Sequence, residues 1–293
     1  MSTSANRTNI SLQKAMRSLK PSIMVLLCIT GFMPLTMLAQ GDLLITPRRV
    51  VFEGNNQRQE ITLANTGQDT ARYNISFVQY RMTEEGTFEQ IESPDPGQMF
   101  ADPYLRYFPR SVTLAPQESQ VVRMQLRRLP DMQDGEYRSH MYFRAVPVER
   151  PLGEEDMLAD TTAIGIRLTP IFGITIPVII RVGSVSASIS LSDLMLVKEE
   201  DMPSALEIVF NRQGNQSVFG DLTVDHISPS GTKTEVGLVR GIAVYTPNAR
   251  RKFTLQLRNT EGVDLTKGKL LVRYTSASEA RPEVFAEKEL LLQ

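Results

Sequence analysis

Hydrophobic and polar residues alternate with a period of two over much of the chain after residue 42. Tyr73, Ile75 and Phe77 alternate with polar residues. Similar runs cover residues 61–64, 122–126 and 141–145. This period is typical of β-strands with one buried face. Clusters of Gly, Pro, Asn and Asp bound the runs and predict turns. Several short strands at this spacing predict an antiparallel β-sandwich.

The longest apolar segment after residue 42 covers residues 163–182. As a single strand, with a rise of about 3.3 Å per residue, it would exceed about 50 Å, which is longer than one sandwich edge. Proline lacks the N–H that a sheet ladder needs and is confined to edges and breaks. The segment is therefore expected to pass from one domain into the next, or to kink at Pro170 or Pro177. We place the domain boundary near residues 177–184.

The second half of the chain repeats the alternation, with turn signals such as Pro229-Ser230-Gly231 between the runs. Strands are expected over residues 185–196, 206–211, 219–227, 237–244, 251–257, 269–275 and 284–292. We find no convincing amphipathic helix. The predicted fold class is all-β, with two β-sandwich domains in tandem at residues 41–181 and 182–293.

The first 40 residues have the features of a secretory signal peptide. Residues 1–20 hold four cations and no acid, an apolar run follows to Leu38, and Ala39 lies at its exit. The alternative is a membrane anchor. It is disfavoured because the apolar run contains Pro34 and is shorter than the ~20 residues that a spanning helix needs. We therefore expect export and cleavage near residue 40.

Composition and charge argue against several kinds of function. The 32 Lys and Arg residues nearly balance the 33 Asp and Glu residues, unlike the charge of a general nucleic-acid binder. One Cys and two His residues are too few for a Cys/His zinc cluster or a disulfide framework. His140 and His226 have no cluster of acids near them in the sequence, and no Gly-x-Ser-x-Gly motif occurs. The sequence predicts a protein that is not an enzyme and uses no metal or cofactor.

Three groups of segments in the first domain follow one another in a recognisable order. They are residues 46–54, with an Arg-x-x-Phe-Glu-Gly pattern that begins at Arg49; residues 61–73; and residues 107–123 with 136–147. Together, over roughly residues 42–182, they resemble the periplasmic pilus (fimbrial) chaperone family, the PapD-like proteins. The second half of the chain is similar to that family mainly in being a second sandwich of the expected length.

The resemblance implies two immunoglobulin-like domains arranged as an L with a cleft between them. Proteins of this family bind newly exported pilus subunits whose own sandwich lacks its last strand, lend them a strand, and pass them to an outer-membrane usher. In such β-augmentation, main-chain hydrogen bonds give affinity and alternate side chains fill the partner's open core. The expected partners in the periplasm are thus an exported pilus or fimbrial subunit and an usher, with no nucleic acid and no small-molecule cofactor.

Arg49 matches the cleft arginine that, in the family, anchors the carboxy-terminal carboxylate of the bound subunit. A guanidinium suits a carboxylate because it donates two parallel, charge-assisted hydrogen bonds. Arg48 points to the opposite face of a strand, so that only one of the pair serves. Ile164, Ile166 and Leu168 are the candidate donor strand. The alternative is that these three side chains close the protein's own core.

The family usually has a second cleft cation, a lysine late in the last strand of the first domain. Here the corresponding stretch reads Ile171-Phe172-Gly173-Ile174, without a lysine. Either the cleft arginine acts alone, or Arg144, Arg167 or Arg181 supplies the second charge. Glu136 resembles the acid that joins an inter-domain ion pair in the family, with Arg181 as its candidate partner.

Other functions remain open at the level of the sequence. The main alternative is a structural or adhesive surface protein that uses two immunoglobulin-like modules as spacers and has no client. A self-capping dimer is an alternative state of the free protein. A carbohydrate-binding module is disfavoured because the chain has no Trp.

Overall fold

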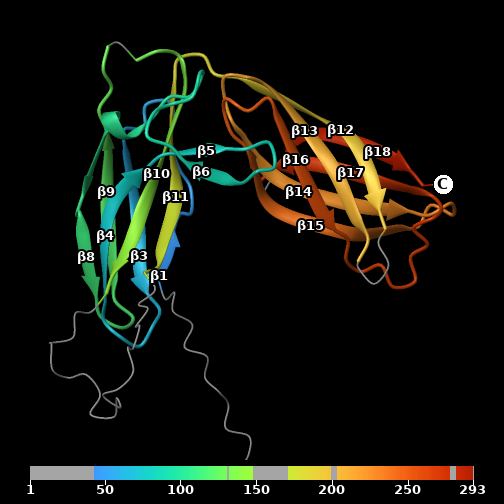
Figure 1. Cartoon of the computed structure of the whole chain (residues 1–293), viewed down its shortest axis with the longest axis horizontal. Coiled ribbons are helices and arrows are strands. Elements are labelled where there is room, and N and C mark those ends of the chain that lie inside the picture. The colour runs from blue at the N-terminus through green and yellow to red at the C-terminus, as the bar shows by residue number, and fades with distance from the viewer. Residues whose placement is uncertain (1–42, 131, 148–170, 199–202, 278–281, 293) are drawn as a thin grey trace, which may run out of the picture. The chain divides into compact units, whose positions relative to one another are not determined.

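The computed structural model describes residues 43–130, 132–147, 171–198, 203–277 and 282–292. In these ranges the elements are strands, apart from one 3₁₀ turn, η1 (Asp102–Tyr104). The strands form two immunoglobulin-like β-sandwiches in tandem (Figure 1), which confirms the predicted fold class. Within the described ranges, no helix has the length and apolarity needed to cross a membrane.

The first sandwich packs a four-stranded sheet on a five-stranded sheet. The four-stranded sheet, in spatial order, consists of β1 (Leu43–Thr46), β3 (Arg58–Asn65), β9 (Ser119–Leu126) and β7 (Leu105–Phe108). The five-stranded sheet consists of β2 (Val50–Phe52), β11 (Gly173–Val182), β10 (Gly135–Val146), β4 (Ala71–Val78) and β8 (Ser111–Leu114). The alternating apolar side chains meet between the sheets, among them Phe52, Leu63 and Phe143.

The second sandwich contains all seven strands that the sequence predicts, with ends shifted by a few residues. One sheet consists of β12 (Ala187–Val197), β13 (Ala205–Gly214) and β16 (Arg250–Gln256). The other consists of β15 (Lys233–Val244), β14 (Val218–Ile227), β17 (Lys269–Ser276) and β18 (Val284–Leu291). Phe210, Val224 and Tyr274 lie in its core. The chain from Gly41 to Gln293 forms one compact unit, and its division into two separate domains at residue 181 stays a prediction.

Strand β11 runs through Pro177 without the kink that the sequence led us to consider. It pairs antiparallel with β10 along its whole length. On its other side it pairs only from Val178 to Ile180, in parallel, with β2. Pro177 thus lies just before the residues of β11 that pair on both sides. A residue without an N–H is tolerated there, because that part of the strand is an edge.

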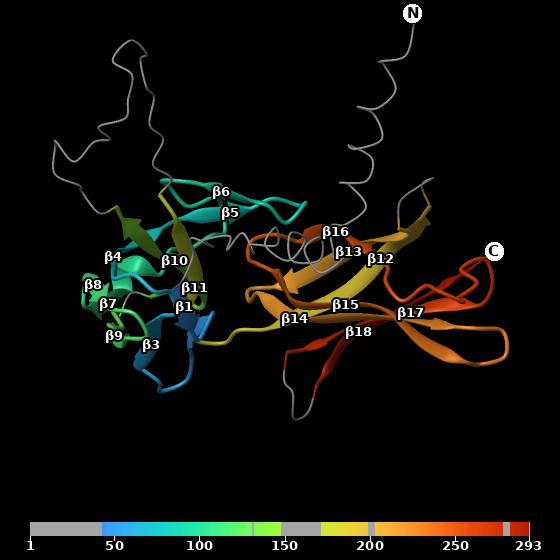
Figure 2. The ribbon, with the colours of Figure 1, turned by 90° about the horizontal axis from the view of Figure 1, so that it is seen from below.

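A hairpin that the alternation does not predict projects from the first sandwich (Figures 1 and 2). It consists of β5 (Tyr80–Met82) and β6 (Phe88–Gln90), which pair antiparallel. Asn248 Nδ2 donates hydrogen bonds to the carbonyl oxygens of Met82, at 2.7 Å, and Thr83, at 3.2 Å. Met82 also packs against Ile179 and Tyr245 in a small apolar cluster. The hairpin is thus tied to the second sandwich by both polar and apolar contacts.

Several sequence-based predictions lie outside the described residues. These are the signal peptide at residues 1–40, the candidate donor residues Ile164, Ile166 and Leu168, the candidate cation Arg167, and a kink at Pro170.

Candidate functional site

Arg49, the candidate carboxylate anchor, lies just before β2 and faces aromatic residues of the second sandwich. It is half-buried, whereas Arg48 is exposed. Its Nη1 donates a hydrogen bond to the hydroxyl of Tyr245 at 3.2 Å, and its Cζ lies 4.7 Å from the centre of the Phe219 ring. Nη2 is buried and has no hydrogen-bond partner among the described residues. Arg49 is therefore held by cation–π contacts and keeps an unused donor.

Arg138 and His140 occupy alternate positions of β10 and share one face of the strand. Both are buried, with exposed fractions of 2% and 4%. The Cζ of Arg138 lies 4.1 Å from the centre of the Tyr245 ring. The His140 ring makes edge contacts with Tyr80 and Phe88 of the hairpin, at centroid distances of 5.1 and 5.5 Å. This face of β10 is therefore covered by the hairpin and by the second sandwich instead of facing solvent.

This face of β10 carries the buried positive charge of Arg138. Arg138 donates from Nη2 to the carbonyl oxygen of Tyr80 at 3.3 Å, while its Nε and Nη1 have no partner among the described residues. Burial lowers the pKa of Arg138 to about 10, and the charge of Arg49 acts in the same direction. Burial, together with the charges of Arg138 and Arg49, lowers the pKa of His140 to about 3. His140 is therefore neutral at pH 7, whereas Arg138 stays charged.

Glu136 forms a buried link between β10 and the second sandwich. Its Oε2 accepts a hydrogen bond from the backbone N–H of Ser217 at 3.1 Å, and the Ser217 hydroxyl donates to Oε1. Arg181 Nε donates to Glu136 at 3.4 Å, and Arg181 Nη1 pairs with Glu53 at 2.9 Å. The charge of Arg181 is thus already balanced by two acids.

The three arginines proposed as a second cation are placed very differently. Arg181 lines a cavity of about 610 Å³ together with Arg49, Glu53 and Phe219. Arg144 is exposed at the opposite end of β10. Arg167 lies outside the described residues. Of the two candidates that lie among the described residues, only Arg181 is near Arg49, and its guanidinium pairs with Glu53 and Glu136.

The amino-terminal half of β11 is an edge with apolar side chains. From Gly173 to Pro177 the strand pairs with β10 on one side and has no strand partner on the other within the described chain. Ile171, Phe172 and Ile174 are large apolar residues here, with 37–46% of their surface exposed. Such an edge presents unpaired main-chain groups next to apolar side chains, which is the arrangement that strand addition requires.

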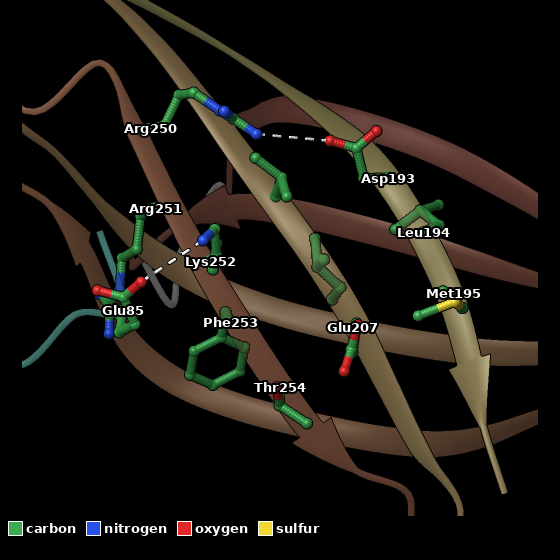
Figure 3. Close-up of a pocket in the computed structure, with 12 residues that line it drawn as sticks. Glu85, Asp193, Leu194, Met195, Glu207, Arg250, Arg251, Lys252, Phe253 and Thr254 are labelled. Atoms are coloured by element: carbon green, nitrogen blue, oxygen red, sulfur yellow. Dashed lines mark ion pairs between the residues drawn. The ribbon is translucent and has the colours of Figure 1, made fainter.

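A second groove, of about 920 Å³, lies on the sheet that contains β12, β13 and β16 (Figure 3). Four of its charged side chains form two ion pairs: Arg250 with Asp193 at 3.8 Å, and Lys252 with Glu85 at 3.5 Å. Apolar side chains such as Phe253 fill much of the remaining lining. Glu207 and Arg251 also line the groove and take part in neither ion pair, and Arg251 Nε has no hydrogen-bond partner among the described residues.

The histidines and acids of the described chain form no metal site. No group of three or more His, Cys, Asp or Glu residues comes together there. His226 is buried, and its Nε2 lies 2.9 Å from the carbonyl oxygen of Lys267. His140 is packed between aromatic rings, as described above. Both histidine side chains are therefore buried and in contact with other residues of the fold.

Sequence reasoning missed four residues of this site: Arg138, Ser217, Phe219 and Tyr245. Arg138 could have been noticed as a charged residue between Glu136 and His140 on alternate positions of one strand. The other three come from the second sandwich, whose contacts with β10 and Arg49 no local pattern reveals.

The chain matches known proteins when structures are compared. No family model and no curated protein matches the chain. The YadV chaperone is 11% identical, with a TM-score of 0.43, and the match covers 86% of this chain and 100% of that chain. A second match is the CsuC–CsuE chaperone–tip adhesion subunit pre-assembly complex from the archaic chaperone-usher Csu pili of Acinetobacter baumannii. It shows 12% identity and a TM-score of 0.45, and the match covers 86% of this chain and 100% of that chain. The CupB2 chaperone of Pseudomonas aeruginosa is 12% identical, with a TM-score of 0.40, and the match covers 84% of this chain and 98% of that chain. Over most of its length, this chain is similar to solved chaperone structures.

Proposed function

We propose that this protein is a periplasmic chaperone for exported pilus or fimbrial subunits. It binds a subunit by adding a strand that includes the edge of β11 to the subunit's incomplete sandwich, and it delivers the subunit to an outer-membrane usher. The observation that carries this proposal is the edge from Gly173 to Pro177, which lies beside exposed apolar side chains. An uncapped edge of this kind is an aggregation hazard unless a partner uses it.

The alternation of apolar residues extends this edge towards the amino terminus. Ile164, Ile166 and Leu168 continue the period-two pattern ahead of β11. In our proposal they enter the open core of the subunit, while the main chain from residue 173 onward extends the shared sheet. Main-chain hydrogen bonds then supply affinity for many subunits, and the apolar side chains supply the fit.

Arg49 anchors the carboxy-terminal carboxylate of the subunit in this proposal. Its place beside a cavity and its unused, buried Nη2 support the role. Glu136, which is paired with Arg181, links β10 to Ser217 of the second sandwich and so supports the aromatic residues on which Arg49 stacks.

The proposed role of the β11 edge in binding is tested by capture of a subunit in a bacterial periplasm. The captured partner is identified by mass spectrometry. We expect wild-type protein to co-purify with a small exported pilus subunit. Ile174→Asp places a charge on the edge and should reduce the captured amount about tenfold or more. Leu238→Asp is the matched control, because Leu238 has a similar exposure, 41% against 37%, but lies in β15 of the second sandwich.

Two results would contradict the proposal. One is equal loss of capture in both variants. The other is a wild-type protein that retains no exported subunit, which favours the spacer function instead.

A further inference from the structure

Gly173 lies at the start of the open edge of β11 and has no side chain to pack there. A glycine inside a strand weakens the strand, and it often marks a place where another group approaches the backbone closely. The glycines of the described chain with a positive φ do not include Gly173, so its backbone conformation is one that other residues adopt as well. The reason for a glycine at this position is therefore the space around it.

The side chain of Tyr142 occupies the space next to Gly173. Strands β10 and β11 lie side by side (Figure 1), and Tyr142 is directly opposite Thr175, so that Gly173 is its diagonal neighbour. Met141 and Phe143 point into the core, which places Tyr142 on the outer face of the sheet. A Cβ atom on Gly173 would lie 2.5 Å from the Tyr142 hydroxyl oxygen and closer still to Cε2. Because Gly173 has no side chain, the phenol ring lies across β11.

The hydroxyl end of the Tyr142 ring lies at the strand that carries the open edge. From Gly173 to Pro177 this strand has no partner on its open side within the described chain. Directly opposite side chains on neighbouring strands have Cβ atoms about 4.5–5.5 Å apart. The hydroxyl, at 2.5 Å from the Cβ position of Gly173, is therefore within reach of the side chain that an added strand would place opposite Gly173.

The hydroxyl of Tyr142 differs from those of the packed tyrosines of the chain. Tyr142 is half-buried, and no hydrogen bond joins its hydroxyl to the described residues. A buried tyrosine hydroxyl usually has a partner, as those of Tyr107 and Tyr274 have here. Aromatic rings in sheets cover the bare backbone of edge glycines, but that role needs the ring and not the hydroxyl. The hydroxyl is thus a free group beside an unpaired strand edge.

We propose that Tyr142 is a specificity-determining residue of the strand-addition edge. This inference rests on the proposed function, because the added strand belongs to the exported subunit. Tyr142 takes the place of the side chain that Gly173 lacks, and it makes the cross-strand contact with the subunit residue that faces Gly173. An aromatic ring pairs well with a β-branched side chain across a sheet, and a hydroxyl of that side chain bonds to the phenol. The favoured subunit residue is therefore β-branched, above all threonine.

The contact is tested by competition between two versions of the full-length protein in one periplasm. Wild type and variant carry different affinity tags and draw on the same probe, the exported subunit that the wild type retains. Mass spectrometry measures the amount of subunit bound per copy of each. Tyr142→Phe removes only the hydroxyl and should bind about threefold less subunit, and Tyr142→Ala about tenfold less.

Tyr104→Phe is the matched control. Tyr104 is also half-buried in the first sandwich, but it lies in η1 and its ring packs on Tyr137, near the start of β10 and away from Gly173. This variant should bind as much subunit as the wild type does.

Gly173→Ala tests the geometry while keeping Tyr142. Alanine suits the backbone at this position, but its Cβ forces the ring aside. Binding should fall about tenfold, as in Tyr142→Ala, whereas adding Gly173→Ala to Tyr142→Ala should cause no further loss. An equal loss on either background would show that alanine acts through the strand itself, and it would overturn the proposal.

Two further measurements separate binding from folding. The urea midpoint of free Tyr142→Phe should equal that of the wild type, because the hydroxyl has no partner among the described residues of the free protein. A photo-crosslinking phenylalanine analogue in place of Tyr142 should join to a β-branched residue of the subunit. The same analogue in place of Tyr104 should join to none.

Three other results overturn this inference and leave the proposed function intact. They are a full share of subunit in Tyr142→Phe and Tyr142→Ala, a urea midpoint of Tyr142→Phe that falls together with its share, and a crosslink that is absent or lies on a residue without a branched Cβ. A wild-type protein that retains no subunit contradicts the proposed function, and this inference with it.

Discussion

His140 is a titratable side chain held neutral between aromatic rings and beside two arginines. Its pKa is lowered to about 3 by burial and by the charges of Arg138 and Arg49, against about 6.5 in an unfolded chain. Between these values the unfolded state binds a proton that the folded state does not. The free energy of unfolding therefore falls as the pH drops through this window, and the contribution of His140 is fully present above it.

The resulting prediction compares wild-type protein with His140→Gln. Between about pH 6 and pH 4, the stability of the wild type should fall more steeply than that of the variant, by about 1.4 kcal/mol per pH unit. Urea unfolding at several pH values measures both slopes. Equal slopes would show that His140 takes up a proton in the folded state and that its surroundings admit water or an anion.

At the residue scale, the sequence predicts part of the candidate site. The Arg-x-x-Phe-Glu-Gly pattern singles out Arg49, and the start of the later strand singles out Glu136. Arg138 stands in the same strand, but its burial depends on a hairpin and on a second sandwich that lie far away in the sequence. A polar residue on a strand is usually solvent-facing, so that only tertiary contacts reveal that Arg138 is buried.

At the scale of elements, one side chain of the second sandwich makes two of the hydrogen bonds that hold the β5–β6 hairpin. Asn248 Nδ2 donates to the carbonyl oxygens of Met82 and Thr83. We expect Asn248→Ala to leave these acceptors to water and to loosen the hairpin locally. Hydrogen exchange of the amides of residues 80–90 should become about tenfold faster, which corresponds to the loss of roughly 1.4 kcal/mol of local stability.

Asn215→Ala is the control for this change. Asn215 forms hydrogen bonds with Ser184 and Ser186 at a turn away from the hairpin. It should leave the exchange of residues 80–90 unchanged. If Asn248→Ala behaves in the same way, the remaining contacts of the hairpin, which include Met82 with Tyr245 and the Lys252 N–H with the carbonyl oxygen of Glu84, are enough to hold it.

Most of the strands follow from local pattern, and the hairpin does not. Strands that bury one face on a core must alternate, and β4, β9 and β14 do so in the sequence. Strand β6 is exposed at all three of its positions, so that it has no buried face to impose a pattern. The parallel pairing of β2 with β11 is likewise invisible in sequence, because short apolar strands do not specify their partners.

At the scale of the whole molecule, Glu136 joins strand β10 to the second sandwich through Ser217. The carboxylate is buried and accepts two hydrogen bonds from Ser217. We expect Glu136→Ala to lower the free energy of unfolding by about 2–3 kcal/mol, because it leaves the Ser217 N–H and the Arg181 Nε–H without their acceptor. Scanning calorimetry should show one cooperative transition in the wild type and two separated transitions in the variant.

Glu60→Ala is the control, since Glu60 pairs with Arg123 on the exposed surface of the first sandwich. Exposed pairs contribute little, so that this variant should unfold as the wild type does. A single transition in Glu136→Ala would mean that the other contacts between the sandwiches, such as those of Met82, Asn248 and Tyr245, are enough to couple them.

The parallel pairing of β2 with β11 has a consequence for the order in which the first sandwich forms. Val51 pairs with Ile179, so that the segment directly after Arg49 gains its neighbour only when a strand much later in the chain has been made. Contacts of such long sequence separation form slowly. A growing polypeptide therefore contains Arg49 early, but the strand pairing that follows Arg49 forms late, after β11 has been synthesised.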